Sequence, residues 1–161
     1  MGAENDLFQR SIAALAGGNP ERAKQQILKL LEKDKNNLEL LTFLTAIYQQ
    51  YQQPQNGLQT AQRIAKLEPD NPRHWNNLGY LYILLGRWED AEKCYAKATK
   101  LDEAAPTVYL NYALSLIELG KTKEATVQFQ KALNHALSGE LLDIIQTDPQ
   151  FTKLRPLVNK L

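Results

Sequence analysis

The stretch from Pro72 to Asp102 reads PRHWNNLGYLYILLGRWEDAEKCYAKATKLD, and it decides the fold. Before Gly86, side chains three and four residues apart define one helical face: Trp75, Leu78, Gly79 and Tyr82. After Gly86, a second helical face follows: Ala91, Tyr95 and Ala98. Gly79 and Ala91 are small enough to let two helices approach closely, and the aromatic side chains fill the remaining gaps. The stretch therefore predicts a pair of packed, antiparallel helices.

This spacing resembles the tetratricopeptide repeat, whose pattern is W-x₂-L-G-x₂-Y and then A-x₃-F, with a period of 34 residues. The same period runs along the rest of the chain. Small residues occupy two columns throughout, namely Ser11, Thr45, Gly79 and Ala113 in one and Ala23, Gly57, Ala91 and Ala125 in the other. Helix breakers repeat as well, because Gly18, Gly86 and Gly120 share a turn column in which Gln52 is the exception. The chain thus resembles four repeats in register.

The resemblance implies an all-α fold, a right-handed superhelical solenoid of antiparallel helix pairs. We expect four repeat units within residues 1–139, at 4–37, 38–71, 72–105 and 106–139, and a C-terminal capping helical segment at 140–161. Asp148 and Pro149 are a cap and a first-position proline for a short turn in that segment. The segment is expected to cover the exposed face of the last repeat. The alternative is a tail folded into the groove, which would be autoinhibitory.

Composition excludes several classes of function. A formal net charge of +1 argues against a nucleic-acid binder, which would show a basic stripe. No apolar run is long enough to span a membrane, and the first residues lack the pattern of a signal peptide, so we expect no membrane insertion and a cytoplasmic location. Cys94 is the only cysteine, and we interpret it as a small hydrophobic side chain on a helix.

No catalytic constellation is found, so we expect a protein that is not an enzyme. His74 and His135 lie far apart, and neither has a cysteine or carboxylate at a metal-ligand spacing. Gly17 and Gly18 lie in a turn between helices and lack the strand and lysine of a phosphate-binding loop. We therefore expect no cofactor and no metal.

The remaining candidate is a partner-binding surface. In this family the first helix of each repeat lines the concave face, so the resemblance implies a groove lined by Phe43, Arg73, Asn76, Asn77, Tyr80, Leu84, Leu110, Asn111, Leu114 and Ile117. Such a lining suits a peptide or a short helix with apolar anchors. Asn77 and Asn111 share a column and could bond a peptide backbone, while Tyr80 and Phe43 could be aromatic anchors. The alternatives are a solvated helix face for the amides and ordinary packing for the rings.

The main hypothesis is a non-catalytic scaffold or adaptor that binds a peptide or helical segment of a partner protein, in the assembly of a multiprotein complex. A chaperone that holds an unfolded client segment is one alternative, and a homo-oligomeric assembly element is another. Family members that bind the acidic tails of Hsp70 or Hsp90 need a clamp of two lysines, an arginine and two asparagines. Only Asn77 matches that clamp, so this partner class is rejected.

Overall fold

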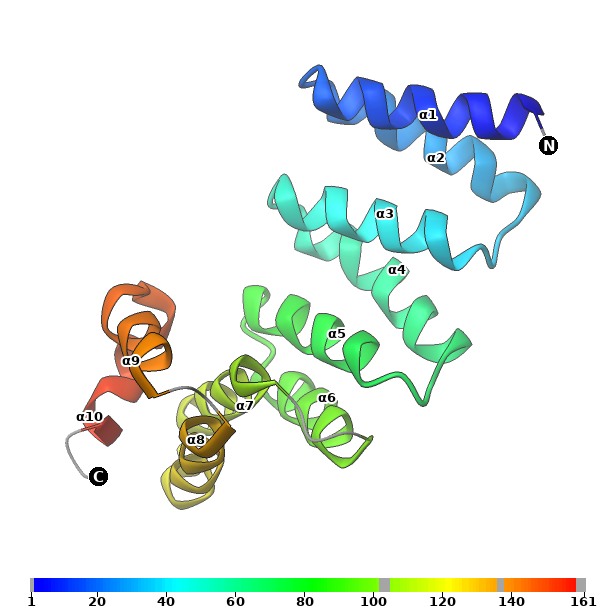
Figure 1. Ribbon diagram of the computed structural model, residues 1–161. Helices are drawn as coiled ribbons and strands as arrows, with labels where there is room; N and C mark the ends of the chain where they lie inside the picture. The colour runs from blue at the N-terminus through cyan, green and yellow to red at the C-terminus, as the bar shows by residue number, and fades with distance from the viewer. Residues whose placement is uncertain (1, 102–104, 136–137, 159–161) are drawn as a thin grey trace. The chain divides into compact units, whose positions relative to one another are not determined.

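The computed structural model describes residues 2–101, 105–135 and 138–158, and these residues form helices without any strand (Figure 1). The elements, in chain order, are α1 (Gly2–Ala16), α2 (Pro20–Lys33), α3 (Leu38–Gln50), α4 (Pro54–Leu67), α5 (Pro72–Leu84), α6 (Trp88–Leu101), α7 (Pro106–Glu118), α8 (Thr122–His135), α9 (Ser138–Thr147), the 3₁₀ helix η1 (Pro149–Leu154) and α10 (Arg155–Val158). The all-α class expected from the sequence is confirmed. The end of the expected terminal segment, residues 159–161, lies outside the described residues.

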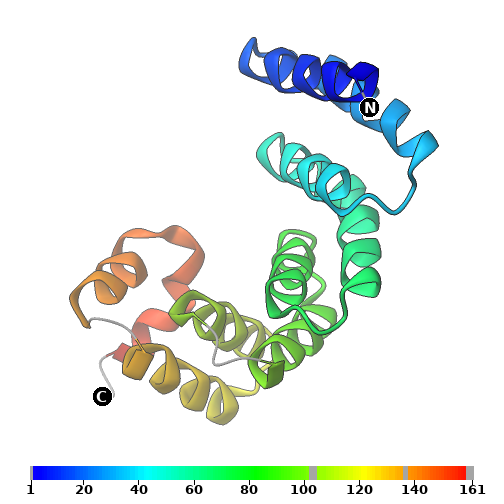
Figure 2. The same cartoon turned by 45° about the vertical axis from the view of Figure 1, so that its right-hand side comes forward.

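The helices pack as neighbours in sequence within two compact units. Unit 1 is Met1–Glu68 and pairs α1 with α2 and α3 with α4. Unit 2 is Pro69–Leu161 and pairs α5 with α6 and α7 with α8, with α9, η1 and α10 after them (Figure 2). Helices α3, α5 and α7 begin at residues 38, 72 and 106, one repeat period apart. Helix α9 begins at Ser138, two residues before the expected start of the terminal segment.

Local sequence sets where the helices begin. Asn19, Asn37 and Asn71 precede α2, α3 and α5, and each side-chain oxygen accepts a hydrogen bond from a backbone N–H of the first turn. Helices α2, α4, α5 and α7 each begin with proline, which has no N–H to leave unsatisfied at that position. These signals recur at one period, so the helices also begin at one period.

Close packing within each pair follows from the small-residue columns. A Cβ atom added to Gly79 would lie 2.9 Å from Cζ of Tyr95, so α5 and α6 approach each other at the ring of that tyrosine. Ala91, Ala113 and Ala125 are fully buried in unit 2, as is Ala23 in unit 1. The core of unit 1 is an aliphatic cluster of Ile27, Leu30, Leu31, Leu40, Leu41, Leu44 and Ile64. Burial of apolar side chains therefore holds the helices of each pair together, and the polar faces of the helices remain on the surface.

Candidate partner-binding surface

The exposed face of α5 carries five of the expected partner-binding residues. We define the α5 face by its members, Arg73, Asn76, Asn77, Tyr80 and Leu84. Arg73 and Asn77 are exposed, and Asn76 and Tyr80 are half-buried. Leu84 is 44% exposed, which is high for a leucine side chain on a helix of a packed pair. Helical spacing brings these five side chains to one side of α5, and the opposite side packs on α6.

A pocket of about 270 Å³ opens beside the N-terminal ends of α5 and α7. Its lining consists of Pro72, Arg73, Asn76, Ala98, Ala105, Thr107 and Val108. Among these lining residues only Arg73 is charged. The side-chain oxygen of Asn76 is buried and has no hydrogen-bond partner among the described residues. A buried acceptor without a donor costs free energy, so this pocket has a place for one N–H group of a ligand.

The corresponding face of α7 is covered instead of open. We define the α7 face as Leu110, Asn111, Leu114, Ile117 and Glu118. Leu110 is 0% exposed and Leu114 is 3% exposed, while Asn111 and Ile117 are half-buried. The 3₁₀ helix η1 packs against α7, and the Nε2 of Gln150 donates a hydrogen bond of 3.0 Å to the Oδ1 of Asn111. In this conformation Leu110 and Leu114 offer no surface to a partner.

Two tyrosines and an asparagine come together between these faces. The ring of Tyr95 on α6 stacks on that of Tyr112 on α7, with ring centroids 6.5 Å apart. Burial, followed by the nearby Cys94 and Tyr80, raises the pKa of Tyr95 well above its usual value, and the Asn111 amide opposes this shift. No partner lies within bonding distance of the buried Tyr95 hydroxyl among the described residues, although Asn111 is close enough to act on it. Tyr95 is therefore a packing residue of unit 2 with a neutral phenol.

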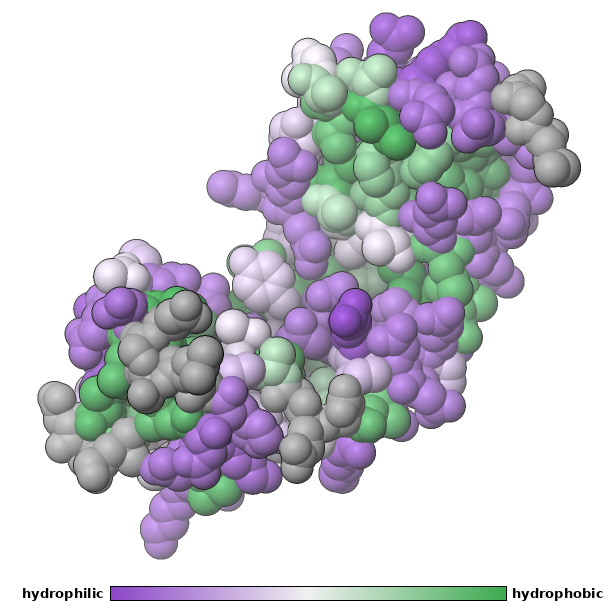
Figure 3. All heavy atoms as spheres, in the orientation of Figure 1, coloured by the Kyte–Doolittle hydropathy of each residue, from purple (hydrophilic) through white to green (hydrophobic). Residues whose placement is uncertain are grey.

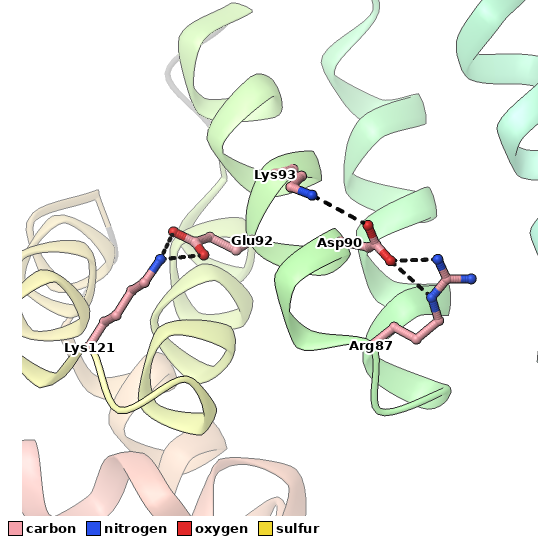
Figure 4. A network of polar contacts seen from close by, with 5 residues as sticks. All are labelled: Arg87, Asp90, Glu92, Lys93 and Lys121. Atoms are coloured by element: carbon pink, nitrogen blue, oxygen red, sulfur yellow. Dashed lines mark hydrogen bonds and ion pairs between the residues drawn. The ribbon is translucent and has the colours of Figure 1, made fainter.

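Polar contacts around the start of α6 include one that joins consecutive helix pairs (Figure 4). The Nζ of Lys121, in the turn before α8, lies 2.7 Å from each carboxylate oxygen of Glu92 on α6. Within the α6 region, Arg87 donates to Asp90 through its Nε at 2.9 Å, and Lys93 lies 3.8 Å from the same carboxylate. None of these charges belongs to the α5 or α7 face. These charged side chains pair with one another within the fold. On the α5 face, Arg73 is the only charged residue.

The last expected residue, Phe43, lies in unit 1 on α3. Its half-buried ring meets the ring of Phe8 on α1 edge to face, with centroids 5.4 Å apart and planes at 70°. Ile12, also on α1, is 38% exposed. Apolar side chains gather over α1 and α3 on the side of unit 1 seen in Figure 3. Phe43 therefore belongs to an apolar surface of unit 1.

Cys94 and His135, two other residues that could carry chemistry, have packed or stacked surroundings. Burial, and secondarily the charge of Asp90, raises the pKa of the Cys94 thiol to about 12, so the nucleophilic thiolate is scarcely populated at neutral pH. His135 is exposed, and its ring stacks on Tyr109. Within residues 2–101, 105–135 and 138–158, no group of His, Cys, Asp and Glu side chains could hold a metal ion. Among the same residues, no helix combines the length and the apolar character that crossing a membrane requires.

Sequence reasoning missed the residues that cover α7. Gln150 contacts Asn111, and the Nζ of Lys153 lies 2.6 Å from Oε2 of Glu118. The spacing of Phe151 and Leu154 signals a short apolar face, but this pattern does not say which helix that face meets. Lys24 was missed too, because a lysine on a helix is expected in water. It is buried, and its Nζ bonds Glu21 at 2.6 Å and Gln53 at 2.9 Å.

Comparison with known proteins agrees with these geometrical findings. Two family models described as Tetratricopeptide repeat match residues 44–110 and 85–139. The tetratricopeptide repeat-containing protein trd-1 of Caenorhabditis elegans is 31% identical over 86 residues, which are 52% of this chain and 11% of that protein. The type IV pilus assembly protein PilF of Pseudomonas aeruginosa is 22% identical over 160 residues, covering 95% of this chain and 64% of that protein. The chain therefore spans less than two thirds of either relative.

The fold is also found among solved structures. MamA from Desulfovibrio magneticus RS-1, residues 41 to the end, superposes with a TM-score of 0.75 at 20% sequence identity. The match covers 85% of this chain and 77% of that one. At this level of identity the likeness concerns the arrangement of the helices alone.

Proposed function

The chain belongs to the tetratricopeptide repeat family, and from this premise we propose that it captures a segment of a partner protein on the α5 face of unit 2. Proteins of this fold serve generally as non-catalytic scaffolds for protein interaction. The proposal adds the place and the mode of contact. The captured segment is extended or only slightly helical, and it is held by backbone hydrogen bonds and one apolar anchor.

The observation that carries the proposal is the buried, unpartnered oxygen of Asn76 in a pocket next to exposed side chains. A peptide backbone brings an N–H donor for this oxygen and leaves its neighbouring carbonyl for the exposed amide of Asn77. Tyr80 and Leu84 then offer apolar surface to one side chain of the segment. Arg73 adds a single cation at the pocket, which suits a carbonyl or a carboxylate of the segment.

The kind of partner is proposed from the likeness to PilF. That protein is named for the assembly of type IV pili, and the match covers 95% of this chain. We therefore place the captured segment in a component of a multiprotein assembly. Two observations support this role. The α5 face carries little charge, and the ion pairs of unit 2 connect residues of the fold to one another.

A chaperone role is favoured by one separate observation. Phe8, Phe43 and the 38% exposed Ile12 give unit 1 an apolar surface that would suit an unfolded, apolar client. Hydrogen–deuterium exchange on a captured partner separates the two roles. A partner segment that is unprotected before capture and that engages unit 1 indicates a chaperone, whereas capture at unit 2 alone indicates an adaptor.

The first experiment selects peptides from a displayed random library on the full chain and measures their affinity for variants. Replacing Asn76 with alanine should weaken capture by about 1 kcal/mol, roughly fivefold, because it removes the acceptor for the peptide N–H. The same change should leave the melting temperature unchanged, since that oxygen has no hydrogen-bond partner within the described part of the chain. Asn77→Ala should weaken capture to a similar degree.

The control for this experiment is Asn134→Ala, which removes an exposed amide from α8, outside the α5 face. It should leave affinity unchanged. Selected peptides that bind the Asn76 and Asn77 variants as well as the parent chain would remove the basis of the proposal.

A further inference from the structure

The segment after Thr147 is seated on α7 by polar contacts at two positions. The Nε2 of Gln150 donates to Asn111, and the Nζ of Lys153 pairs with Glu118 at 2.6 Å. Between and beside them, Phe151 and Leu154 of η1 are buried, and so are Leu110 and Leu114 of α7. The two elements pack on each other in unit 2, so their apolar sides are withdrawn from water together.

The repeat register makes this contact informative. Asn111 lies 34 positions after Asn77, and Glu118 lies 34 positions after Leu84. Leu110 and Leu114 likewise lie 34 positions after Asn76 and Tyr80, respectively. The tail therefore occupies on α7 the columns that are open on α5. It shows what kind of segment the α7 face accepts, namely a short helical turn with an amide, an apolar side chain and a cation.

The seated segment has little structure of its own to rely on. It is a six-residue 3₁₀ helix, capped by Asp148, whose side chain accepts from the backbone N–H of Gln150 at 2.9 Å. Short 3₁₀ helices are marginal in water, so packing on α7 and on α9 supplies the order. The ion pair is also weakly protected, because the side chain of Lys153 is 60% exposed. The ion pair therefore holds the segment only weakly, and burial of Phe151 and Leu154 supplies most of the docking.

We propose that the α7 face is a binding site for a short helical segment of a partner protein with the pattern Gln-Phe-x-Lys-Leu, and that the chain's own residues 150–154 hold it until displaced. The acidic Glu118 selects a cation in the partner, and Asn111 selects a side chain that donates a hydrogen bond. Leu110 and Leu114 become available when the tail leaves. This inference extends the proposed function to a second face, and its test does not depend on the α5 face.

Competition between tail and partner sets the affinity. A tethered segment acts at an effective concentration of about millimolar, so it competes strongly although its individual contacts are weak. A free segment of equal affinity for the face then binds the parent chain poorly. Weakening the tail alone, with the α7 face intact, should raise the affinity for that segment by the factor that the tether imposes.

The test uses the full chain and a labelled peptide of residues 147–158, TDPQFTKLRPLV. Lys153→Glu in the chain sets two carboxylates against each other and should release the tail, and the peptide should then bind at least tenfold more tightly than it binds the parent. Lys123→Glu makes the same charge change on exposed α8 and should not alter binding. A peptide with Lys153→Glu should fail on the released chain. It should bind a chain that carries Glu118→Lys alone, in which the new lysine and Lys153 repel each other and release the tail.

Hydrogen exchange provides the second measurement. The amides of residues 106–118 should lose protection in the Lys153→Glu chain and regain it when the peptide is added, while unit 1 keeps its protection as the check on folding. Unchanged protection of α7 in this variant, and in the milder Gln150→Ala chain, would show a fixed cap and overturn the proposal. Release of the tail without peptide binding, or a stable dimer of the released chain in light scattering, would overturn it as well.

These results are separable from those on the α5 face. If Asn76→Ala has no effect on selected peptides while the tail peptide binds the released chain, the proposed function fails and this inference stands. If the tail peptide never binds while Asn76→Ala weakens capture, the reverse is true.

Discussion

At the scale of single residues, the small side chains decide whether a helix pair can form. Gly79 faces the ring of Tyr95, and even a methyl group there would approach the ring carbons to 2.9–3.1 Å. Ala113 and Ala125 hold the equivalent columns in the next pair, and both are completely buried. A side chain larger than these has no free volume to enter, because the interior is close-packed.

Replacing Gly79 with leucine should therefore destabilise unit 2 by at least about 1–3 kcal/mol, the usual range for overpacking. Denaturant titration followed by circular dichroism measures the loss. Asn77→Leu is the matched control, since it adds the same side chain on the exposed side of α5 and should change stability little. Equal midpoints for the two variants would contradict the packing seen at Tyr95.

The packing of Tyr95 illustrates how the residue scale limits function as well. Its hydroxyl is buried with no partner at bonding distance among the described residues, and the neighbouring thiol of Cys94 is held neutral. Both groups are buried, so neither offers surface to a partner. On the α5 face, the residues proposed to bind are those that the packing leaves exposed or half-buried.

At the scale of elements, the turns within the pairs share one backbone conformation. Gly18, Gly86 and Gly120 have φ values of 74°, 66° and 74°, and Gln52 has 53° at the equivalent position between α3 and α4. A residue with a Cβ atom is strained in this left-handed region. Each helix pair requires a residue with positive φ in its turn. Between α3 and α4 this residue is Gln52 and not glycine.

Gln52→Gly should accordingly stabilise unit 1 by about 1 kcal/mol, because glycine adopts positive φ without a steric penalty. The side chain of Gln52 is exposed, so its removal loses little packing. Gln52→Ala keeps the Cβ atom and serves as the control that should show no gain. Urea titration of the three chains decides the matter, and a Gly variant no more stable than the Ala variant would argue against strain at this turn.

Polar contacts between elements also recur with the repeat period, although the side chains that form them differ. In unit 1 the Nζ of Lys24 bonds the side chain of Gln53, which lies in the turn before α4. In unit 2 the carboxylate of Glu92 accepts from Lys121, in the turn before α8. Both contacts join residues 29 positions apart and occupy equivalent register positions. The geometry of the helix pair favours a polar contact there, whichever side chain donates.

At the scale of the whole molecule, the stability of the fold depends on pH through buried groups that must remain neutral. Burial raises the pKa of Cys94 to about 12 and that of Tyr95 well above its usual value. An unfolded thiol titrates near pH ~8.5, so above this pH the unfolded state loses a proton that the folded state keeps. This contribution to stability is complete below about pH 8.5 and is lost as the pH rises toward about 12.

The free energy of unfolding should therefore fall as the pH rises from 8 to 10, with a slope of at most ~1.4 kcal/mol per pH unit for one thiol. Denaturant titrations at several pH values measure this slope. Cys94→Ala should flatten it between about pH 8.5 and the range where tyrosine titrates, near pH 10. An equal slope in the parent and the alanine chain would mean that the thiol titrates alike in both states.

Much of the fold follows from the sequence, and less of the candidate surface. The repeat period places the starts of α3, α5 and α7, because asparagine caps and first-position prolines recur with it. The α5 face follows from helical spacing alone. Leu110 and Leu114 share that spacing, yet they are buried, and η1, about 40 residues later in the sequence, packs against the same helix. Local periodicity carries no information on such a contact.

The sequence by itself determined the helix pairs of this protein, because a short period of apolar and small residues can be satisfied only by neighbouring helices that bury it. Only the tertiary structure decided that η1 sits on α7 while the face of α5 stays open. The physical reason is that apolar burial has no direction. Phe151 and Leu154 require a cover, but many apolar faces could supply one, and the choice among them rests on the fit of Gln150 to Asn111 and of Lys153 to Glu118.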